Sequence, residues 1–183
     1  GELVTGYITW SPDGSKIAYT SNRSLYVVNS DGSSSKKLAE PNTAEWKGEI
    51  IEDQPRRPIW SPDGDYIIFD DFEMPSFWVG YHILSECRSV YAVSVAGGER
   101  IMLAPRGALG DQTANRTKVL VETEPGKSSV HKCSILITTD LREWQPSLLD
   151  GERSFQKEAE LPKCLYGIWS LDGSVIICSL GTD

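Results

Sequence analysis

The chain has few basic residues and few histidines. Its 18 lysines and arginines are outnumbered by 26 aspartates and glutamates, which gives a formal net charge of −8. Nucleic-acid binding depends on clustered Lys and Arg that neutralise phosphates, so no nucleic-acid partner is expected. Only His82 and His131 could serve as an imidazole base, and no Gly-x-Ser-x-Gly motif is present. We therefore predict no catalytic residue and no enzymatic activity in this chain.

Long apolar runs are also absent. No stretch approaches the roughly 20 apolar residues that a membrane helix requires, so membrane insertion is not expected. No segment shows a long helical stripe of apolar residues. A leading signal peptide is missing, but the chain does not begin with Met, so this absence is weak evidence about export. With 39% apolar residues in 183, the composition predicts a single soluble domain.

The chain does contain a repeated pentapeptide. Trp-Ser-Pro-Asp-Gly at residues 10–14 recurs at 60–64 and, as Trp-Ser-Leu-Asp-Gly, at 169–173. The interval from Trp60 to Trp169 is close to twice the interval from Trp10 to Trp60, which implies that a hidden copy lies between Trp60 and Trp169. Residues 112–121 supply it, because they keep the order of turn residues, a Lys and an apolar run. Repeats of this length are typical of solenoids and propellers, whose units cannot bury an apolar face alone.

Each repeat reads as four short β-strands, predicted in the first repeat at residues 7–10, 16–20, 25–29 and 36–39. The Ser-Pro-Asp-Gly link predicts a hairpin turn, because Pro presets φ, Asp bonds to the local backbone and Gly accepts a positive φ. Asp31-Gly32, Gly97-Gly98 and Asp140 are expected to form the turns between third and fourth strands. The repeated Trp is expected to pack between neighbouring sheets in a structural role.

Within the first repeat, Trp-Ser-Pro-Asp-Gly, Lys-Ile-Ala-Tyr-Thr-Ser and Leu-Tyr-Val-Val-Asn-Ser-Asp-Gly resemble the TolB-type, WD-repeat-like β-propeller family. The resemblance spans most of the chain. It implies an all-β propeller of four-stranded antiparallel blades, with about three complete blades and partial ones at both ends. It implies little about function, because this repeat occurs in periplasmic transport-associated proteins, in propeller domains of peptidases and in uncharacterised secreted proteins. A periplasmic or extracellular location follows from the same resemblance.

The repeats are expected near residues 1–48, 49–105, 106–163 and 164–183, so the last has no room for its third and fourth strands. Residues 1–5 resemble the outer strand at 98–103 and predict a start late in a preceding blade. Closed propellers normally have four to eight blades, and unpaired sheet edges invite association. We therefore predict either a segment of a longer propeller or a subunit that self-associates to complete one.

The four cysteines, Cys87, Cys133, Cys164 and Cys178, allow three disulfide pairings between which the spacing does not choose. Cys178 lies in an apolar run and is expected to be a small buried core residue. A disulfide of Cys87 with Cys133 or Cys164 is the alternative to free thiols.

Metal and glycosidase sites are less favoured than ordinary structural or surface roles, and no metal or cofactor is predicted. A zinc site would combine His82, Cys87, His131 and Cys133, whose spacing is unfamiliar for zinc ligands. A calcium site competes with a solvated acidic loop, and its ligands would be Asp63, Asp65, Asp70, Asp71 and Glu73. Residues 138–144 resemble a hairpin of glycosidase propellers that is itself structural.

Three inserts interrupt the repeats, at residues 40–58, 70–89 and 124–132. Because strands alternate in direction, we expect the inserts to share one face, opposite the Ser-Pro-Asp-Gly turns. Long loops on a rigid scaffold are a usual place for recognition, and aromatic and Arg side chains are enriched at binding hot spots. The predicted binding residues are Trp46, Arg56, Arg57, Phe72, Glu73, Phe77, Trp78 and Tyr81. The alternative is that the aromatic rings cap the blade or fill the channel.

We interpret the chain as a non-catalytic, TolB-like scaffold that binds a protein, peptide or small ligand through the insert-bearing face. The alternative is the substrate-gating propeller of a larger peptidase or glycosidase whose catalytic part lies outside this chain.

Overall fold

The computed structural model describes residues 6–41, 43–46, 49–52, 54–72, 88–104, 107–123, 135–140, 159–162 and 164–180. Every helix or strand assigned in these residues is a β-strand, and neighbouring strands pair antiparallel. The predicted all-β class is therefore confirmed. No helix in this part of the chain is long and apolar enough to cross a membrane.

Three sheets have four strands each, in chain order, and two have two strands. Blade 1 contains β1 (Ile8–Trp10), β2 (Lys16–Ser21), β3 (Ser24–Asn29) and β4 (Lys36–Ala39). Blade 2 contains β7 (Arg56–Trp60), β8 (Tyr66–Phe72), β9 (Arg88–Ser94) and β10 (Ile101–Ala104). Blade 3 contains β11 (Gly107–Gln112), β12 (Lys118–Thr123), β13 (Ile135–Asp140) and β14 (Ala159–Pro162). Blade 4 is the pair β15 (Cys164–Trp169) and β16 (Ile176–Leu180), and β5 (Thr43–Trp46) pairs with β6 (Glu49–Glu52).

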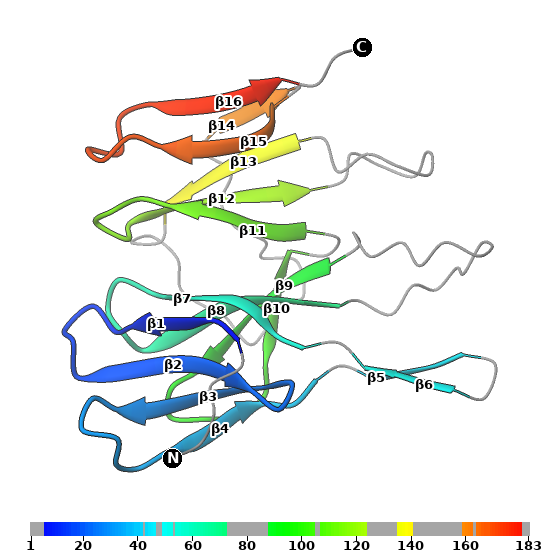
Figure 1. The fold of residues 1–183 in the computed structure, drawn as a ribbon. Helices are drawn as coiled ribbons and strands as arrows, with labels where there is room; N and C mark the ends of the chain where they lie inside the picture. Colours follow the sequence, from blue (N-terminus) through cyan, green and yellow to red (C-terminus); the bar gives the residue numbers. More distant parts are fainter. Residues whose placement is uncertain are drawn as a thin grey trace.

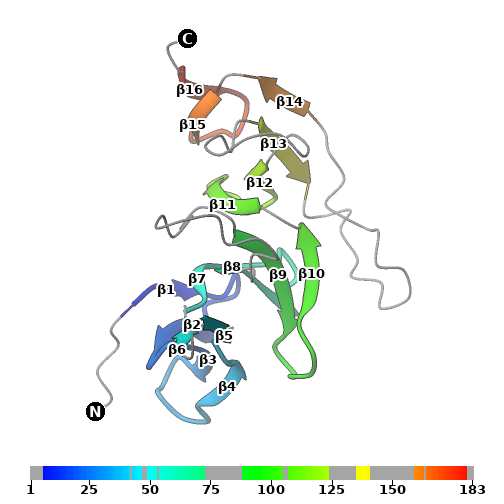
Figure 2. The ribbon, with the colours of Figure 1, turned by 90° about the vertical axis from the view of Figure 1, so that its right-hand side faces the viewer.

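The blades fan out like a sector of a ring. Figure 2 shows the first strands β1, β7, β11 and β15 gathered on one side and the outer strands β4, β10 and β14 on the other. Blade 1 and blade 4 lie at opposite ends of the stack, and the turns after the first strands all lie on its left side in Figure 1. Hairpin β5–β6 lies on the opposite side. This is the β-propeller architecture that the repeats predicted.

The turn after the first strand has the same hydrogen bond in all four blades. In blade 1, Gly14 N donates to Ser11 O at 3.0 Å, and the Gly14 φ of 71° lies in the left-handed region that glycine adopts readily. Blade 3 lacks the Pro-Asp-Gly sequence, yet Arg116 N donates to Thr113 O at 2.8 Å with an Arg116 φ of 61°. The third copy of the turn thus forms where the alignment of the repeats placed it.

The apolar core lies between the blades. Along β8, Ile67 and Phe69 pack towards blade 1, whereas Ile68 packs towards blade 3. Along β12, Val119 packs against blade 2 and Leu120 packs against blade 4. This alternation follows from the two-residue period of a strand. Blades 2 and 3 are therefore apolar on both faces, which explains the continuous apolar runs in their second strands.

The repeated Trp packs between blades only where a preceding blade covers it. Trp60 is 1% exposed, and its Nε1 donates to Thr9 O of blade 1 at 3.2 Å. Trp169 packs against Leu120 of blade 3. Trp10 is 49% exposed, because among the described residues no blade lies on that face of β1. The expected position between sheets is thus found for Trp60 and Trp169 and is wrong for Trp10.

Cys178 also differs from expectation, because it is disulfide-bonded and not a free core thiol. It is half-buried and packs against the cluster around Leu120. The side chains of Cys87, Cys133 and Cys164 lie outside the described residues. The expected core position is therefore met only in part, and an apolar run contains no information on whether a cysteine forms a disulfide.

Replacing Trp60 with Ala should lower the free energy of unfolding by roughly 3 to 5 kcal/mol, because a buried aromatic side chain is removed from the contact between blades. Urea denaturation measures this change. Leu171→Ala is the control, since Leu171 is 93% exposed and exposed substitutions usually change stability by about 0.5 kcal/mol or less. Equal stability of the two variants would contradict the role assigned to Trp60.

Candidate functional site

The turn side of the propeller, which carries the four turns after β1, β7, β11 and β15, satisfies its own carboxylates. Asp172 Oδ1 in blade 4 accepts hydrogen bonds from Ser170 Oγ at 2.5 Å and Ser174 Oγ at 2.7 Å. These bonds favour the ionised carboxylate and lower the pKa of Asp172 to about 2. The pKa of Asp13 in blade 1 is lowered in the same way, first by Ser11. These carboxylates are therefore engaged in holding the turns.

Blade 3 departs from this pattern at Arg116. The other three turns hold Gly at that position, whereas the Arg116 φ of 61° is costly for a residue with a side chain. Arg116 NH1 donates to the carbonyl oxygen of Trp10 in blade 1. Gln112, which replaces the repeated Trp, donates through Nε2 to Trp60 O at 3.4 Å. Blade 3 is thereby tied to blades 1 and 2 near the turn side.

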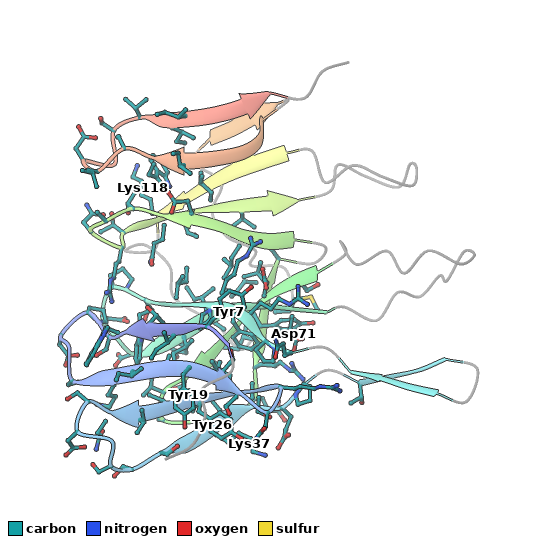
Figure 3. The ribbon with its side chains drawn as sticks, viewed as in Figure 1. Tyr7, Tyr19, Tyr26, Lys37, Asp71 and Lys118 are labelled. Carbon is teal, nitrogen blue, oxygen red and sulfur yellow. The ribbon has the colours of Figure 1, made fainter. Side chains whose placement is uncertain are left out.

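The insert-bearing side is the side on which β8 ends, β9 begins and hairpin β5–β6 lies. Figure 3 shows Asp71 towards this side, at the far end of β8 from the turn. Asp70 and Asp71 are 1% and 0% exposed, so the solvated acidic loop expected there is wrong. Asp71 Oδ2 pairs with Arg100 NH1 at 2.9 Å, and the Arg100 guanidinium lies over the Tyr91 ring, 5.3 Å from its centroid. A buried carboxylate requires such a partner.

Arg57 and Asp70 connect blade 2 to blade 3. Arg57 NH1 donates to Leu109 O, and Leu109 N donates to Asp70 Oδ2 at 3.2 Å. The Arg57 φ of 48° falls where the pairing of β7 with β8 shifts register, between Arg56 and Ile59. The Arg57 side chain thus contributes to the contact between blades as well as to the exposed surface.

The structure describes four of the eight predicted binding residues and places them on three strands. Trp46 is the last residue of β5 and Phe72 is the last residue of β8. Arg56 and Arg57 were predicted to lie in an insert, but they lie in β7. The strand continues through Pro58 because β7 is at the edge of its sheet, where proline is tolerated. The remaining predicted residues, Glu73, Phe77, Trp78 and Tyr81, lie outside the described residues.

Hairpin β5–β6 was not predicted, although its signal was present. Its register pairs Thr43 with Glu52 and Trp46 with Glu49. The two strands flank Lys47-Gly48, and a two-residue link that contains Gly is typical of a β-hairpin. In Figure 1 the hairpin projects beyond the blades. The insert prediction was correct in placing this segment opposite the turns and wrong in expecting a loop.

The metal hypotheses gain no support from the described part of the chain, where no group of three or more His, Cys, Asp or Glu could hold a metal ion. The calcium hypothesis fails because Asp63 and Asp65 precede β8, whereas Asp70 and Asp71 lie near its other end. The other residues named for metals, Glu73, His82, Cys87, His131 and Cys133, lie outside the described residues. Of the glycosidase-like hairpin at 138–144, only residues 138–140 are described, within β13.

Comparison of the sequence with family models finds no match. Comparison with curated proteins finds no match either.

Solved structures share the fold. A TolB candidate from Agrobacterium tumefaciens is 14% identical, with a TM-score of 0.50 over 92% of this chain and 50% of that one. Hydrazine synthase from Kuenenia stuttgartiensis is 14% identical, with a TM-score of 0.52 over 94% of this chain and 58% of that one. This chain therefore spans little more than half the length of the chains that it resembles. At this identity the likeness shows the β-propeller fold alone.

Asp172 should titrate with a pKa of about 2 in place of its ordinary value of 3.8. Because the folded-state pKa is the lower one, the carboxylate stabilises the fold fully above about pH 4, and this contribution is lost as the pH falls through the folded pKa. Carboxyl-carbon NMR measures the titration.

The Ser170→Ala substitution removes the largest cause of the shift and should raise the Asp172 pKa towards 3.8. Asn115 occupies the same turn position in blade 3 and does not titrate, so it provides an internal reference. A pKa near 3.8 in the unsubstituted chain would contradict the hydrogen-bonded turn.

Proposed function

We propose that this propeller is a non-catalytic scaffold that binds a partner on its insert-bearing side. Hairpin β5–β6 carries the proposal, because it projects beyond the blades in Figure 1 and, among the described strands, β5 and β6 pair only with each other. A two-stranded hairpin is marginally stable by itself in water. A partner that packs on this hairpin or extends it would therefore be favoured.

The difference between the turn side and the insert-bearing side supports binding on the insert-bearing side. On the turn side, short turns use their polar groups for local hydrogen bonds. On the insert-bearing side, the Arg100 side chain is 28% exposed and is held in place by the buried Asp71 carboxylate and the Tyr91 ring. A guanidinium fixed in this way is a preorganised hydrogen-bond donor for a ligand that approaches from solvent.

Among proteins, peptides and small ligands, an extended peptide suits the hairpin best. Each of its two strands has a backbone edge to which no described strand is paired, and peptides commonly bind by adding a strand to such an edge. The formal charge of −8 and the acidic residues Glu45, Glu49 and Glu52 of the hairpin disfavour a polyanion.

We also propose a periplasmic or extracellular location. The disulfide at Cys178 supports it, because structural disulfides persist in oxidising compartments. The TolB-type resemblance of the repeats points to the same compartments.

A second candidate is the propeller domain of a larger peptidase or glycosidase. The observation that favours it is that the chain spans little more than half the length of the propeller chains it resembles. A hydrolase domain in the same reading frame would favour this candidate over a free-standing scaffold.

A random peptide library displayed on phage can test the binding side. Peptides selected on the unsubstituted chain should bind the Trp46→Ala variant at least about tenfold more weakly, because central aromatic anchors contribute more than about 1.4 kcal/mol. Leu171→Ala, on the turn side, is the control and should leave affinity unchanged. Peptides that bind all three proteins equally would place recognition elsewhere, and a library without enriched peptides would count against a peptide ligand.

Peptide mapping without reductant should recover Cys178 in a disulfide-linked peptide. Under oxidising conditions, Cys178→Ser should lower the free energy of unfolding by about 2 to 4 kcal/mol, because the cross-link no longer restricts the unfolded chain. Adding reductant should abolish the difference between the two proteins. A free Cys178 thiol in protein isolated without reductant would remove this support for export.

A further inference from the structure

The exposed apolar side chains gather on the two blades at the ends of the stack. All but one of the large hydrophobic side chains exposed among the described residues belong to blade 1 or blade 4 and their turns. On β1, Ile8 and Trp10 are 60% and 49% exposed. On blade 4, Ile168 and Ile177 are 57% and 63% exposed and are paired directly across β15 and β16. Surfaces of this kind mark interaction sites.

Two of the three contacts between successive blades have the same direction. The face of a blade towards the preceding blade carries the repeated Trp, as Trp60 does towards blade 1 and Trp169 towards blade 3. The face that receives this Trp is aliphatic. Leu25 and Val27 of blade 1 lie in the cluster of Trp60, and Leu120 of blade 3 lies in the cluster of Trp169. The contacts of blade 1 with blade 2 and of blade 3 with blade 4 therefore join a Trp-bearing face to an aliphatic face, whereas blade 3 carries Gln112 in place of Trp towards blade 2.

The two free faces at the ends have these same two characters. Trp10 occupies the repeat position of Trp60, so the free face of blade 1, which also carries Ile8, is a Trp-bearing face. On β15, Trp169 packs towards blade 3, so its neighbour Ile168 points to the free face together with Ile177. The free face of blade 4 is therefore an aliphatic face. The two ends of the stack therefore complement each other as the faces around Trp60 and Trp169 do inside it.

We propose that two copies of this chain join head to tail into a closed ring, with the Trp10 face of each copy packed on the Ile168–Ile177 face of the other. Each copy offers one face of each kind, so a two-fold axis forms two identical contacts and leaves neither face exposed. Within one copy, blade 1 and blade 4 lie at opposite ends of the stack and do not meet (Figures 1 and 2). A second copy satisfies both faces at once.

The number of blades supports the same assembly. The described residues of each copy form three four-stranded blades and the two-stranded blade 4, which brings the pair within the roughly four to eight blades of closed propellers. The contact between copies is continuous with the packing between blades inside each copy.

Size-exclusion chromatography with light scattering measures the molar mass of the chain in solution. We expect twice the mass of one chain, which is 20.3 kDa, over a wide range of concentration. A mass of one chain would overturn the proposal, and so would a mass of more than two chains, which indicates an open series of copies.

Two substitutions test the head-to-tail geometry. Trp10→Arg and Ile177→Arg each block one of the two faces, and each should reduce the mass to that of a single chain. If each face paired instead with the same face of the other copy, one of these two variants would remain dimeric. A dimeric variant would therefore overturn the head-to-tail geometry. Met102→Arg is the control, because Met102 is 46% exposed on the outer strand β10, away from both faces. Circular dichroism monitors folding, and Ile8→Arg or Ile168→Arg replaces a variant that does not fold.

Discussion

Packing of apolar side chains between neighbouring sheets is the interaction on which the rest of this structure depends. Each sheet is thin, and its side chains alternate between two faces, so a blade can bury them only between two other blades. Ile67 and Ile68, adjacent in β8, belong to different cores for this reason. Trp60 is the largest side chain in the first of these cores and also donates a hydrogen bond to the backbone of blade 1.

Polar groups reinforce this packing where the first strands meet. Asp70 and Arg57 bond to the two backbone groups of Leu109, and Asp111 Oδ2 accepts Trp169 N at 2.8 Å. The bonds of Arg57 and Asp111 link successive first strands, and that of Asp70 links the second strand β8 to the first strand of blade 3. First strands have no neighbouring strand on one side within their own sheets. An unpaired backbone group is costly when it is shielded from water, so side chains that satisfy it also set the angle between blades.

The turn side and the insert-bearing side of the propeller differ in how their polar groups are used. Turns that satisfy their own donors and acceptors leave little for a partner, whereas hairpin β5–β6 adds backbone edges and the cluster of Asp71, Arg100 and Tyr91 adds a fixed guanidinium. The blades supply a rigid base, which limits the conformational entropy lost on binding to the elements that project from it. These differences between the two sides are the reason why we propose recognition on the insert-bearing side.

The sequence by itself determined the local structure, because each turn and strand depends on residues close together in the chain. Trp-Ser-Pro-Asp-Gly and its hidden copy at 112–116 predicted the four first turns, and the repeated order of turn residues and apolar runs predicted the blades. Only the tertiary structure decided which groups become buried or paired. Trp10 and Trp60 have the same local sequence, yet one is 49% and the other 1% exposed, because burial depends on whether a blade lies against that face. The local sequence of Asp71 suggests a solvated acid, but the fold buries it and brings Arg100, distant in sequence, beside it. The local sequence of Cys178 likewise does not show that this residue forms a disulfide, because a disulfide requires a second cysteine that the fold places beside it.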